Sequence, residues 1–279
     1  MSASWKMLEG DTRDRLADLE AESVQTVVTS PPYWGLRDYG VDGQLGLEAT
    51  LDEYVANLVA VFREVRRVLR DDGTVWLNLG DSYAGLKPKD LCGTPWRVAF
   101  ALQADGWWLR QEIIWHKPNP MPESVKDRCT RGHEQVFMLT QKARYFYDAD
   151  AIREADAGTD HARTVLEGQP SLEPSNGLLP THSGLRKAEG RKGAGRNKRS
   201  VWTVATQPYS EAHFATFPPK LIEPCILAGS REGDTVLDPF AGSGTTLMVA
   251  LRHNRSALGI ELNPEYVRLA ERRIRGDIA

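Results

Sequence analysis

The sequence predicts an α/β fold with a doubly wound, mostly parallel sheet, and three observations lead to this prediction. Short β-branched runs alternate with longer segments of helical period in both halves of the chain. Turns rich in Gly or Pro follow several of these runs, as is typical where a strand leaves a sheet. Residues 150–200 interrupt the alternation with Gly, Ser, Pro and charged residues that show no sustained period. Strands that alternate with helices favour parallel pairing, with helices on both faces of the sheet.

The first half contains the longest helical pattern. Apolar residues at positions 51, 54, 55, 58, 59, 62, 65 and 69 recur every three or four residues, and D-D-G at 71–73 is expected to end this helix. A short strand is predicted at 5–8, followed by a turn at Gly10-Asp11. Further strands are predicted at 24–29, 74–79, 108–118 and 133–142, with a second helix at 95–105.

The second half regains regularity after the irregular stretch, which we interpret as an inserted variable region. A helix is expected after Pro219, followed by a strand at 234–240 and a helix at 245–253. A last strand and a last helix are predicted at 256–262 and 264–274. These units continue the strand–helix alternation.

Composition favours a cytoplasmic protein without a metal site. The 35 basic and 38 acidic residues give a net charge of −3, so the chain as a whole is no polycation. Cys92, Cys129 and Cys225 show neither the spacing of metal ligands nor a disulfide framework. No secretion signal is expected, and no apolar run approaches the roughly 20 residues that a membrane helix needs.

A strand, a turn and a helix near residue 240 predict a ligand site. D-P-F-A-G-S-G-T-T follows the strand, and Gly242 and Gly244 let the backbone turn tightly beside a ligand. Glu261 ends the next strand, where an acid is placed to bind ribose hydroxyls. No basic residue between Arg231 and Arg252 is available to meet a pyrophosphate. A nucleoside with a charged but phosphate-free tail is favoured, and S-adenosylmethionine fits; the alternative is a turn that only connects strand to helix.

The stretch T-S-P-P-Y-W, residues 29–34, follows a buried strand and predicts a site for an amino group. The Ser30 side chain and the Pro31 carbonyl can both accept hydrogen bonds from such a group. Tyr33, held by Pro31 and Pro32, offers a flat face to a planar base. Transfer of an activated methyl group to an exocyclic amine needs positioning and proton removal, but no covalent enzyme nucleophile. The alternative is a proline turn packed by aromatic rings.

These motifs resemble those of the DNA amino-methyltransferases, which transfer a methyl group from S-adenosylmethionine to cytosine N4 or adenine N6. The catalytic motif precedes the cofactor motif here, as in the beta-type permuted arrangement of that family. The resemblance implies a Rossmann-like methyltransferase sheet. Its catalytic half would be residues 1–149, its target-recognition insert 150–200 and its cofactor half 201–279.

The resemblance also implies a set of cofactor-binding residues. They are Asp11, His213, Asp238, Pro239, Phe240, Gly242, Ser243, Gly244, Thr245 and Glu261. Asp81, in G-D-S-Y at the end of a predicted strand, either lines the site or caps a turn.

Double-stranded DNA is the partner that the resemblance implies. Enzymes of this kind flip the target base out of the duplex. Tyr33 is then expected to stack on that base, with Trp34 as a further DNA contact or a supporting wall. Basic residues of the insert would hold phosphates, and these are Arg186, Lys187, Arg191, Lys192, Arg196, Lys198 and Arg199. On composition alone this block could also be a solvated loop. A cognate restriction endonuclease and a homodimer are further candidate partners.

The target base depends on Ser30. Adenine-N6 enzymes most often have Asp at this position, and the S-P-P-Y form favours cytosine N4. Adenine N6 stays open, as does a non-catalytic DNA-binding protein on the same fold. Cys225 follows a proline, as the nucleophile of cytosine-C5 enzymes does, but it precedes the cofactor glycines and is interpreted as a buried helix cysteine. His116 has no acid partner in the sequence and is interpreted as a packing residue or a DNA contact.

Overall fold

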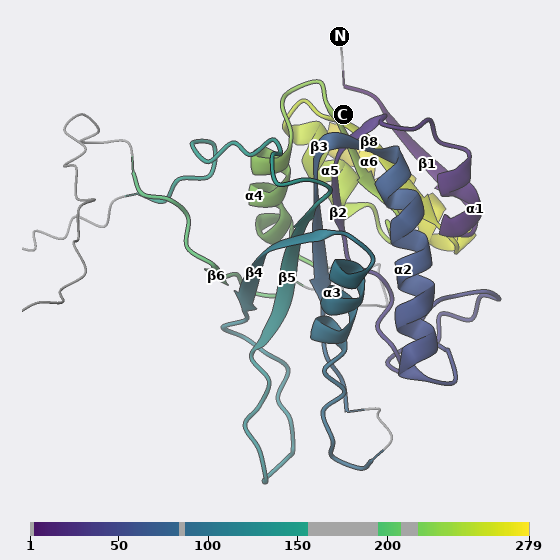
Figure 1. Cartoon of the computed structure of the whole chain (residues 1–279), viewed down its shortest axis with the longest axis vertical. Coiled ribbons are helices and arrows are strands. Elements are labelled where there is room, and N and C mark those ends of the chain that lie inside the picture. Colours follow the sequence, from purple (N-terminus) through teal and green to yellow (C-terminus); the bar gives the residue numbers. More distant parts are fainter. Residues whose placement is uncertain (1–2, 84–86, 156–194, 208–216, 279) are drawn as a thin grey trace, which may run out of the picture.

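The computed structural model describes residues 3–83, 87–155, 195–207 and 217–278 (Figure 1). Its strands form one sheet in the order β1-β8-β7-β2-β3-β5-β4-β6. Neighbours pair in parallel except that β5 runs antiparallel to both β3 and β4. The bounds are β1 Trp5–Glu9, β2 Val24–Thr29, β3 Leu69–Leu79, β4 Trp108–His116, β5 His133–Thr140, β6 Val201–Thr203, β7 Thr235–Asp238 and β8 Ser256–Glu261. This mostly parallel sheet confirms the predicted fold class.

Helices cover both faces of the sheet. Their bounds are α1 Thr12–Ala17, α2 Leu51–Val68, α3 Thr94–Ala104, α4 Pro219–Gly229, α5 Thr245–Arg252 and α6 Pro264–Ile278. One apolar cluster joins α1, α2 and α3 to strand residues such as Val27, and the other joins α4 and α5 to strand residues such as Val28. Because successive strand side chains point to opposite faces, β2 is buried along its whole length.

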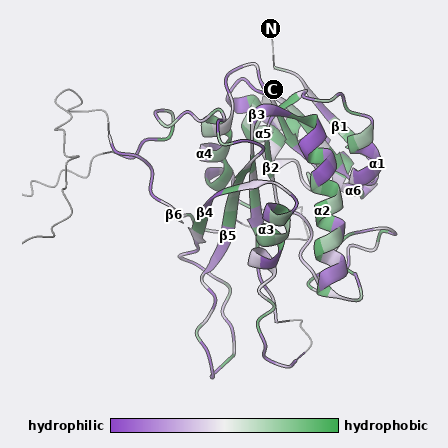
Figure 2. Cartoon of the chain, in the orientation of Figure 1, coloured by the Kyte–Doolittle hydropathy of each residue, from purple (hydrophilic) through white to green (hydrophobic). Residues whose placement is uncertain are grey.

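The pattern of α2 explains both its start and its buried side. Thr50 and Glu53 form a capping box, in which each side chain accepts a hydrogen bond from the other residue's backbone N–H. Six apolar or aromatic residues of the helix are buried, and Figure 2 shows hydrophobic and hydrophilic positions on the same helix. None of the helices within the described residues is long and apolar enough to cross a membrane.

The predicted helix stop at 71–73 is wrong, because D-D-G lies inside β3. Val24 pairs with Leu69 and Thr26 pairs with Thr74, so the residues between Leu69 and Thr74 bulge out of the ladder. Two short elements escaped prediction altogether. Helix α1 has only six residues, and β6 has only three, which is too short for a period to be recognised.

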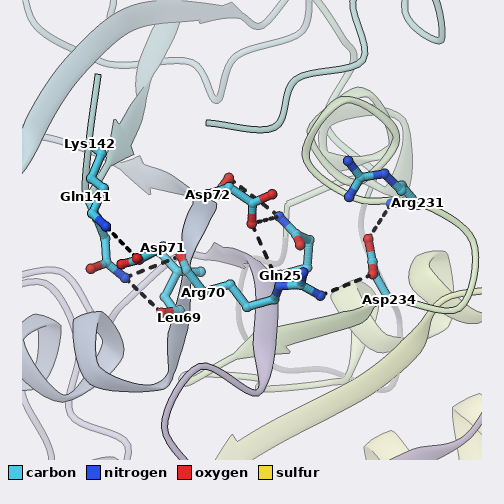
Figure 3. A network of polar contacts seen from close by, with 9 residues as sticks. All are labelled: Gln25, Leu69, Arg70, Asp71, Asp72, Gln141, Lys142, Arg231 and Asp234. Atoms are coloured by element: carbon cyan, nitrogen blue, oxygen red, sulfur yellow. Dashed lines mark hydrogen bonds and ion pairs between the residues drawn. The ribbon is translucent and has the colours of Figure 1, made fainter. Parts of the chain in front are cut away.

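A network of polar contacts surrounds this bulge (Figure 3). Gln141 donates from Nε2 to the carbonyl oxygens of Arg66 at 2.9 Å and Leu69 at 2.8 Å, which would otherwise be open at the end of α2. Gln25 Nε2 donates to Asp72 Oδ1 at 3.2 Å, and Lys142 pairs with Asp71. The bulge is therefore fixed at the edge of the sheet opposite to the carboxyl ends of β2 and β3.

Candidate active site

The two predicted motifs meet at the carboxyl ends of β2 and β7, which are paired in parallel. Asp238, at the end of β7, is 1% exposed. Thr29 and Thr246 each donate a hydroxyl to its carboxylate at 2.7 Å, and the Phe240 N–H donates at 3.1 Å. Thr29 immediately precedes Ser30, so this one carboxylate ties the S-P-P-Y turn to the glycine turn.

Burial raises the pKa of Asp238 to about 6 from its ordinary value of 3.8, against the lowering effect of its three hydrogen bonds. The folded state therefore binds this proton more tightly than the unfolded chain does. The resulting stabilisation is fully present below about pH 4 and is lost as the pH rises through about 6. Its upper limit is about 3 kcal/mol, from about two pKa units.

We expect Asp238→Asn to remove this pH dependence. The Asn oxygen can accept from Thr29 and Phe240, and its amide can donate to Thr246, whose hydroxyl can turn its single proton to the Val28 carbonyl at 3.2 Å instead. The free energy of unfolding in urea, measured from pH 4 to pH 7.5, should fall with rising pH more steeply for the wild type. Parallel curves for the two proteins would contradict the assignment.

The glycine turn has one open and one packed glycine. Both have left-handed backbone angles, with φ of 51° at Gly242 and 77° at Gly244. A Cβ at Gly242 would meet nothing within 4 Å, whereas one at Gly244 would stand 3.0 Å from the Ala270 Cβ of α6. The backbone at Gly242 therefore faces open space that a ligand can fill, and Gly244 allows α6 to pack.

Glu261 lies beside the open glycine. Its carboxylate accepts from the Gly242 N–H and the Asn263 N–H, each at 2.8 Å. Burial raises its pKa, which these backbone hydrogen bonds counteract in part. The Gly10 N–H donates to the Glu261 carbonyl at 2.9 Å, so β1 brings Asp11 to the same edge. This edge offers a carboxylate that can accept hydrogen bonds from ribose hydroxyls, beside a backbone that is open to a ligand.

Asp11 is also the N-cap of α1. It accepts from the Arg13 N–H at 2.8 Å and forms an ion pair with the Arg13 guanidinium, whose hydrogen bond lowers the pKa of the Asp11 carboxyl. The Asp11 side chain is 21% exposed. Part of this carboxylate is therefore accessible to a ligand.

Four other predicted cofactor residues have buried or packed side chains. Arg273 donates to the hydroxyls of Ser243 at 2.9 Å and Thr245 at 2.8 Å, so these two side chains face α6. Pro239 is buried, and Phe240 packs partly against the core. Any contact of Ser243 or Thr245 with a ligand must come from the backbone. His213 lies outside the described residues.

The S-P-P-Y turn is held from two sides. The Tyr54 hydroxyl of α2 donates to the Pro32 carbonyl at 2.7 Å. The half-buried Tyr33 ring lies against the backbone at Gly80, where an added Cβ would stand 2.5 Å from the Tyr33 Cε2. The turn is therefore fixed before any substrate arrives, as positioning catalysis requires.

The structure adds three residues to the site that the sequence did not reveal, namely Asn78, Lys117 and Glu134. Asn78 Nδ2 donates to the Tyr33 hydroxyl at 2.7 Å, and that hydroxyl donates to Glu134 Oε2 at 2.9 Å. Burial, followed by the charge of Glu134, raises the pKa of Tyr33 well above its ordinary value. The one signal in the sequence for these residues was a polar residue, Asn78, inside an otherwise apolar strand. Its partners depend on the antiparallel pairing of β3 with β5, which period alone does not reveal.

The prediction of Trp34 as a DNA contact needs correction. Its side chain is 8% exposed within the apolar core, and its indole N–H donates to the Glu48 carbonyl at 3.0 Å. A buried ring with a satisfied donor is not placed to stack on DNA, and Trp34 instead packs within the core.

The structure also describes three side chains for which the sequence left alternatives, namely Asp81, Cys225 and His116. Asp81 accepts from the N–H groups of Gly93 at 3.1 Å and Thr94 at 3.0 Å, and so caps the start of α3. Cys225 is 1% exposed inside α4, and burial raises the pKa of its thiol. This burial agrees with its interpretation as a buried helix cysteine. His116 Nδ1 lies 3.1 Å from Thr203 Oγ1, between β4 and β6.

Three of the seven basic residues predicted to bind DNA fall in the described part of the chain. Glu154 Oε2 accepts from Arg196 Nε and from Arg199 Nε, each at 3.1 Å, and Lys198 Nζ lies 5.0 Å from the centre of the Trp202 ring. Glu154 and Arg196 also form an isolated antiparallel bridge that joins the two ends of the predicted insert. The other four, Arg186, Lys187, Arg191 and Lys192, lie outside the described residues.

Comparison with known proteins agrees with this geometry. M.XycI, a type II methyltransferase of Xanthomonas campestris pv. cyanopsidis, is 49% identical over 296 residues, which cover 97% of this chain and 87% of that protein. TTHA0409 of Thermus thermophilus, a putative DNA modification methylase solved with S-adenosyl-L-methionine, matches with a TM-score of 0.64 at 27% identity, over 99% of this chain and 96% of that one.

A second solved structure supports the fold alone. PvuII DNA methyltransferase, which is cytosine-N4-specific, matches with a TM-score of 0.71 at 21% identity, over 99% of this chain and 92% of that one. The model of the N6/N4 methyltransferase family, described as DNA methylase, matches residues 24–272 of this chain. The chain therefore belongs to the N6/N4 family of DNA methylases.

Proposed function

We propose that this protein is a cytoplasmic enzyme that transfers a methyl group from S-adenosyl-L-methionine to N4 of a flipped cytosine in duplex DNA. The observation that carries the proposal is the S-P-P-Y turn at the end of β2, tied through Asp238 to the glycine turn at the end of β7. Ser30 in this turn favours cytosine. A DNA modification methylase with the same fold was solved with this cofactor, which supports the choice of methyl donor.

In this proposal Glu261 and Asp11 hold the ribose and adenosine part of the cofactor, beside the open backbone at Gly242. The cofactor, when bound, supplies a methyl group activated by a sulfonium. Ser30 and the Pro31 carbonyl accept hydrogen bonds from the two N–H groups of the target amine, which directs its lone pair away from them. The exposed part of the Tyr33 ring stacks on the base, and this offsets the cost of unstacking it, on the order of a few kcal/mol.

The test of the target base is identification of the product. We expect tritiated methyl transfer to unmethylated DNA, followed by digestion to nucleosides, to yield N4-methylcytosine. N6-methyladenine as the sole labelled product would overturn the choice of base and favour the alternative activity. Failure of the purified protein to bind S-adenosyl-L-methionine would favour a non-catalytic DNA-binding protein.

The DNA contacts and partners are part of the same proposal. Arg199 would meet a phosphate in this proposal, together with Lys198 and the remaining basic residues of the insert, and its 68% exposed side chain supports this role. The similarity to a type II methyltransferase supports a cognate restriction endonuclease as a partner in the cell. A homodimer stays a prediction from the sequence.

A further inference from the structure

We propose that Glu134, held by Lys117, is a positioning residue that fixes the direction of the hydrogen bonds through Tyr33, so that Ser30 meets the target amino group only as an acceptor. The inference rests on the proposed function of Ser30, and it holds for a cytosine or an adenine amino group alike. The catalytic motif of the sequence does not include any of Glu134, Lys117 or Asn78.

The first step is the ion pair itself. Glu134 stands near the start of β5, and Lys117 follows the end of β4, which is paired with β5. Lys117 Nζ donates to Glu134 Oε1, and the two side chains are only 18% and 14% exposed. Lys117 Nζ also lies 4.3 Å from the centre of the buried Trp115 ring. A carboxylate that loses its water needs such a partner, because an uncompensated buried charge is costly.

The second step is the direction of each proton. A carboxylate can only accept hydrogen bonds, so the Tyr33 hydroxyl donates its single hydrogen bond to Glu134 Oε2, at 2.9 Å. Asn78 Nδ2 donates to the same Glu134 oxygen at 2.9 Å and to the Tyr33 oxygen at 2.7 Å. The Tyr33 oxygen can therefore accept from its remaining neighbour but cannot donate to it.

The third step reaches Ser30. Ser30 Oγ lies 3.2 Å from the Tyr33 hydroxyl oxygen, and the only proton left for this contact is that of Ser30. Once that proton points to Tyr33, the Ser30 oxygen keeps only lone pairs for a substrate. An exocyclic amino group presents donors, so this orientation is complementary to it. A serine free to rotate would spend part of its time with its proton toward the amino group.

The experiment uses two variants that change the direction of the hydrogen bonds at Tyr33 but hardly change the shape of the side chains. In Glu134→Gln, the Lys117 ammonium, which can only donate, draws the amide oxygen, so the amide nitrogen faces Tyr33. Tyr33 and Asn78 Nδ2 then both lose the oxygen to which they donate, so the Tyr33 proton is free to turn toward Ser30 and Ser30 is no longer held as an acceptor. In Glu134→Gln combined with Lys117→Met, the glutamine oxygen is free to face Tyr33 again.

Methyl transfer is measured in single turnovers with tritiated S-adenosyl-L-methionine and unmethylated bacterial genomic DNA. We expect Glu134→Gln to lower the transfer rate about 10- to 100-fold, the range for one misdirected hydrogen bond. Its cofactor Kd and its KM for DNA should match those of the wild type, whereas its urea midpoint should fall because Lys117 loses its counter-charge. The double variant should recover a measurable part of the rate, which loss of packing would not allow.

Two outcomes would overturn the inference. One is a wild-type rate for Glu134→Gln, and the other is a double variant as slow as, or slower than, the single one. If Glu134→Gln folds poorly, Tyr33→Phe provides a second test. Lys117→Met should lower the transfer rate of the wild type, but it should not lower the rate of Tyr33→Phe any further. The proposed function is tested separately by the product of the wild type, since a different methylated base would change that product but not the ratios between variants.

Discussion

Replacing Ser30 by Ala is expected to lower the rate of methyl transfer about 100-fold or more, with cofactor binding unchanged. The substitution removes one of the two acceptors that orient the amino group, and positioning of this kind is worth several kcal/mol of the barrier. The fold should survive, because the Ser30 hydroxyl makes only contacts of 3.2 Å and 3.3 Å, to Tyr33 and Asn78. Single-turnover transfer of a tritiated methyl group measures the rate.

Ser23→Ala is a matched control for this prediction. Ser23 precedes β2 at its opposite end, and its hydroxyl donates to the Glu20 carbonyl at 2.7 Å in an exposed turn. The control removes the same group from the same strand unit and should keep the wild-type rate. If Ser30→Ala also kept that rate on duplex DNA, Ser30 would not be catalytic and the assignment of the S-P-P-Y turn would fail.

Glu261→Ala is expected to weaken cofactor binding about 100-fold or more, because a charged acceptor for hydroxyls contributes roughly 1.5–3 kcal/mol for each hydrogen bond. The change also releases the Gly242 N–H and the Asn263 N–H, which donate to Glu261 at 2.8 Å. The glycine turn therefore loses its anchor together with the ribose contact. Isothermal titration with S-adenosyl-L-methionine measures the Kd.

Glu265→Ala is the control for Glu261→Ala. Glu265 lies in the first turn of α6, close to the same edge, but its side chain is exposed. The control removes an equal charge without a contact to the glycine turn, so its Kd should stay within about twofold of the wild type, as is usual for exposed positions. Equal losses for both variants would mean that Glu261 acts through general charge and holds no hydroxyl.

The fold was predictable because its signals are local. The capping box and apolar stripe of α2, the β-branched run of β2 and the glycine turn after β7 each depend on a few adjacent residues. The error at residues 71–73 has a physical cause. A D-D-G sequence is a good helix stop, but here the chain continues as a bulged strand whose polar groups find partners in Gln25, Arg70 and Lys142.

The site was predictable in its motifs and not in its support. Ser30 and Tyr33 stand in a short turn whose acceptors and aromatic ring predict a site for an amino group. Glu261 ends the strand after the glycine turn, where an acid is expected to bind a ribose. Glu134 and Lys117, in contrast, become part of the site only through the antiparallel insertion of β5 between β3 and β4. The sequence predicts Asp238 as a ligand contact, yet three protein donors occupy its carboxylate. Pairing and direction of side chains are tertiary properties, which no single stretch of sequence contains.

The bridge between Glu154 and Arg196 has a consequence for how this enzyme can change its target over evolutionary time. The two ends of the insert are joined there by mutual backbone hydrogen bonds at 2.9 Å and 3.0 Å, reinforced by the Arg196–Glu154 ion pair. The entropy of closing a loop grows only slowly with its length, by about 0.6 kcal/mol for each doubling. Segments of different length and sequence can therefore be exchanged above this bridge without disturbing the sheet, and under the proposed role of residues 150–200 in target recognition, specificity can diverge while the chemistry is inherited intact.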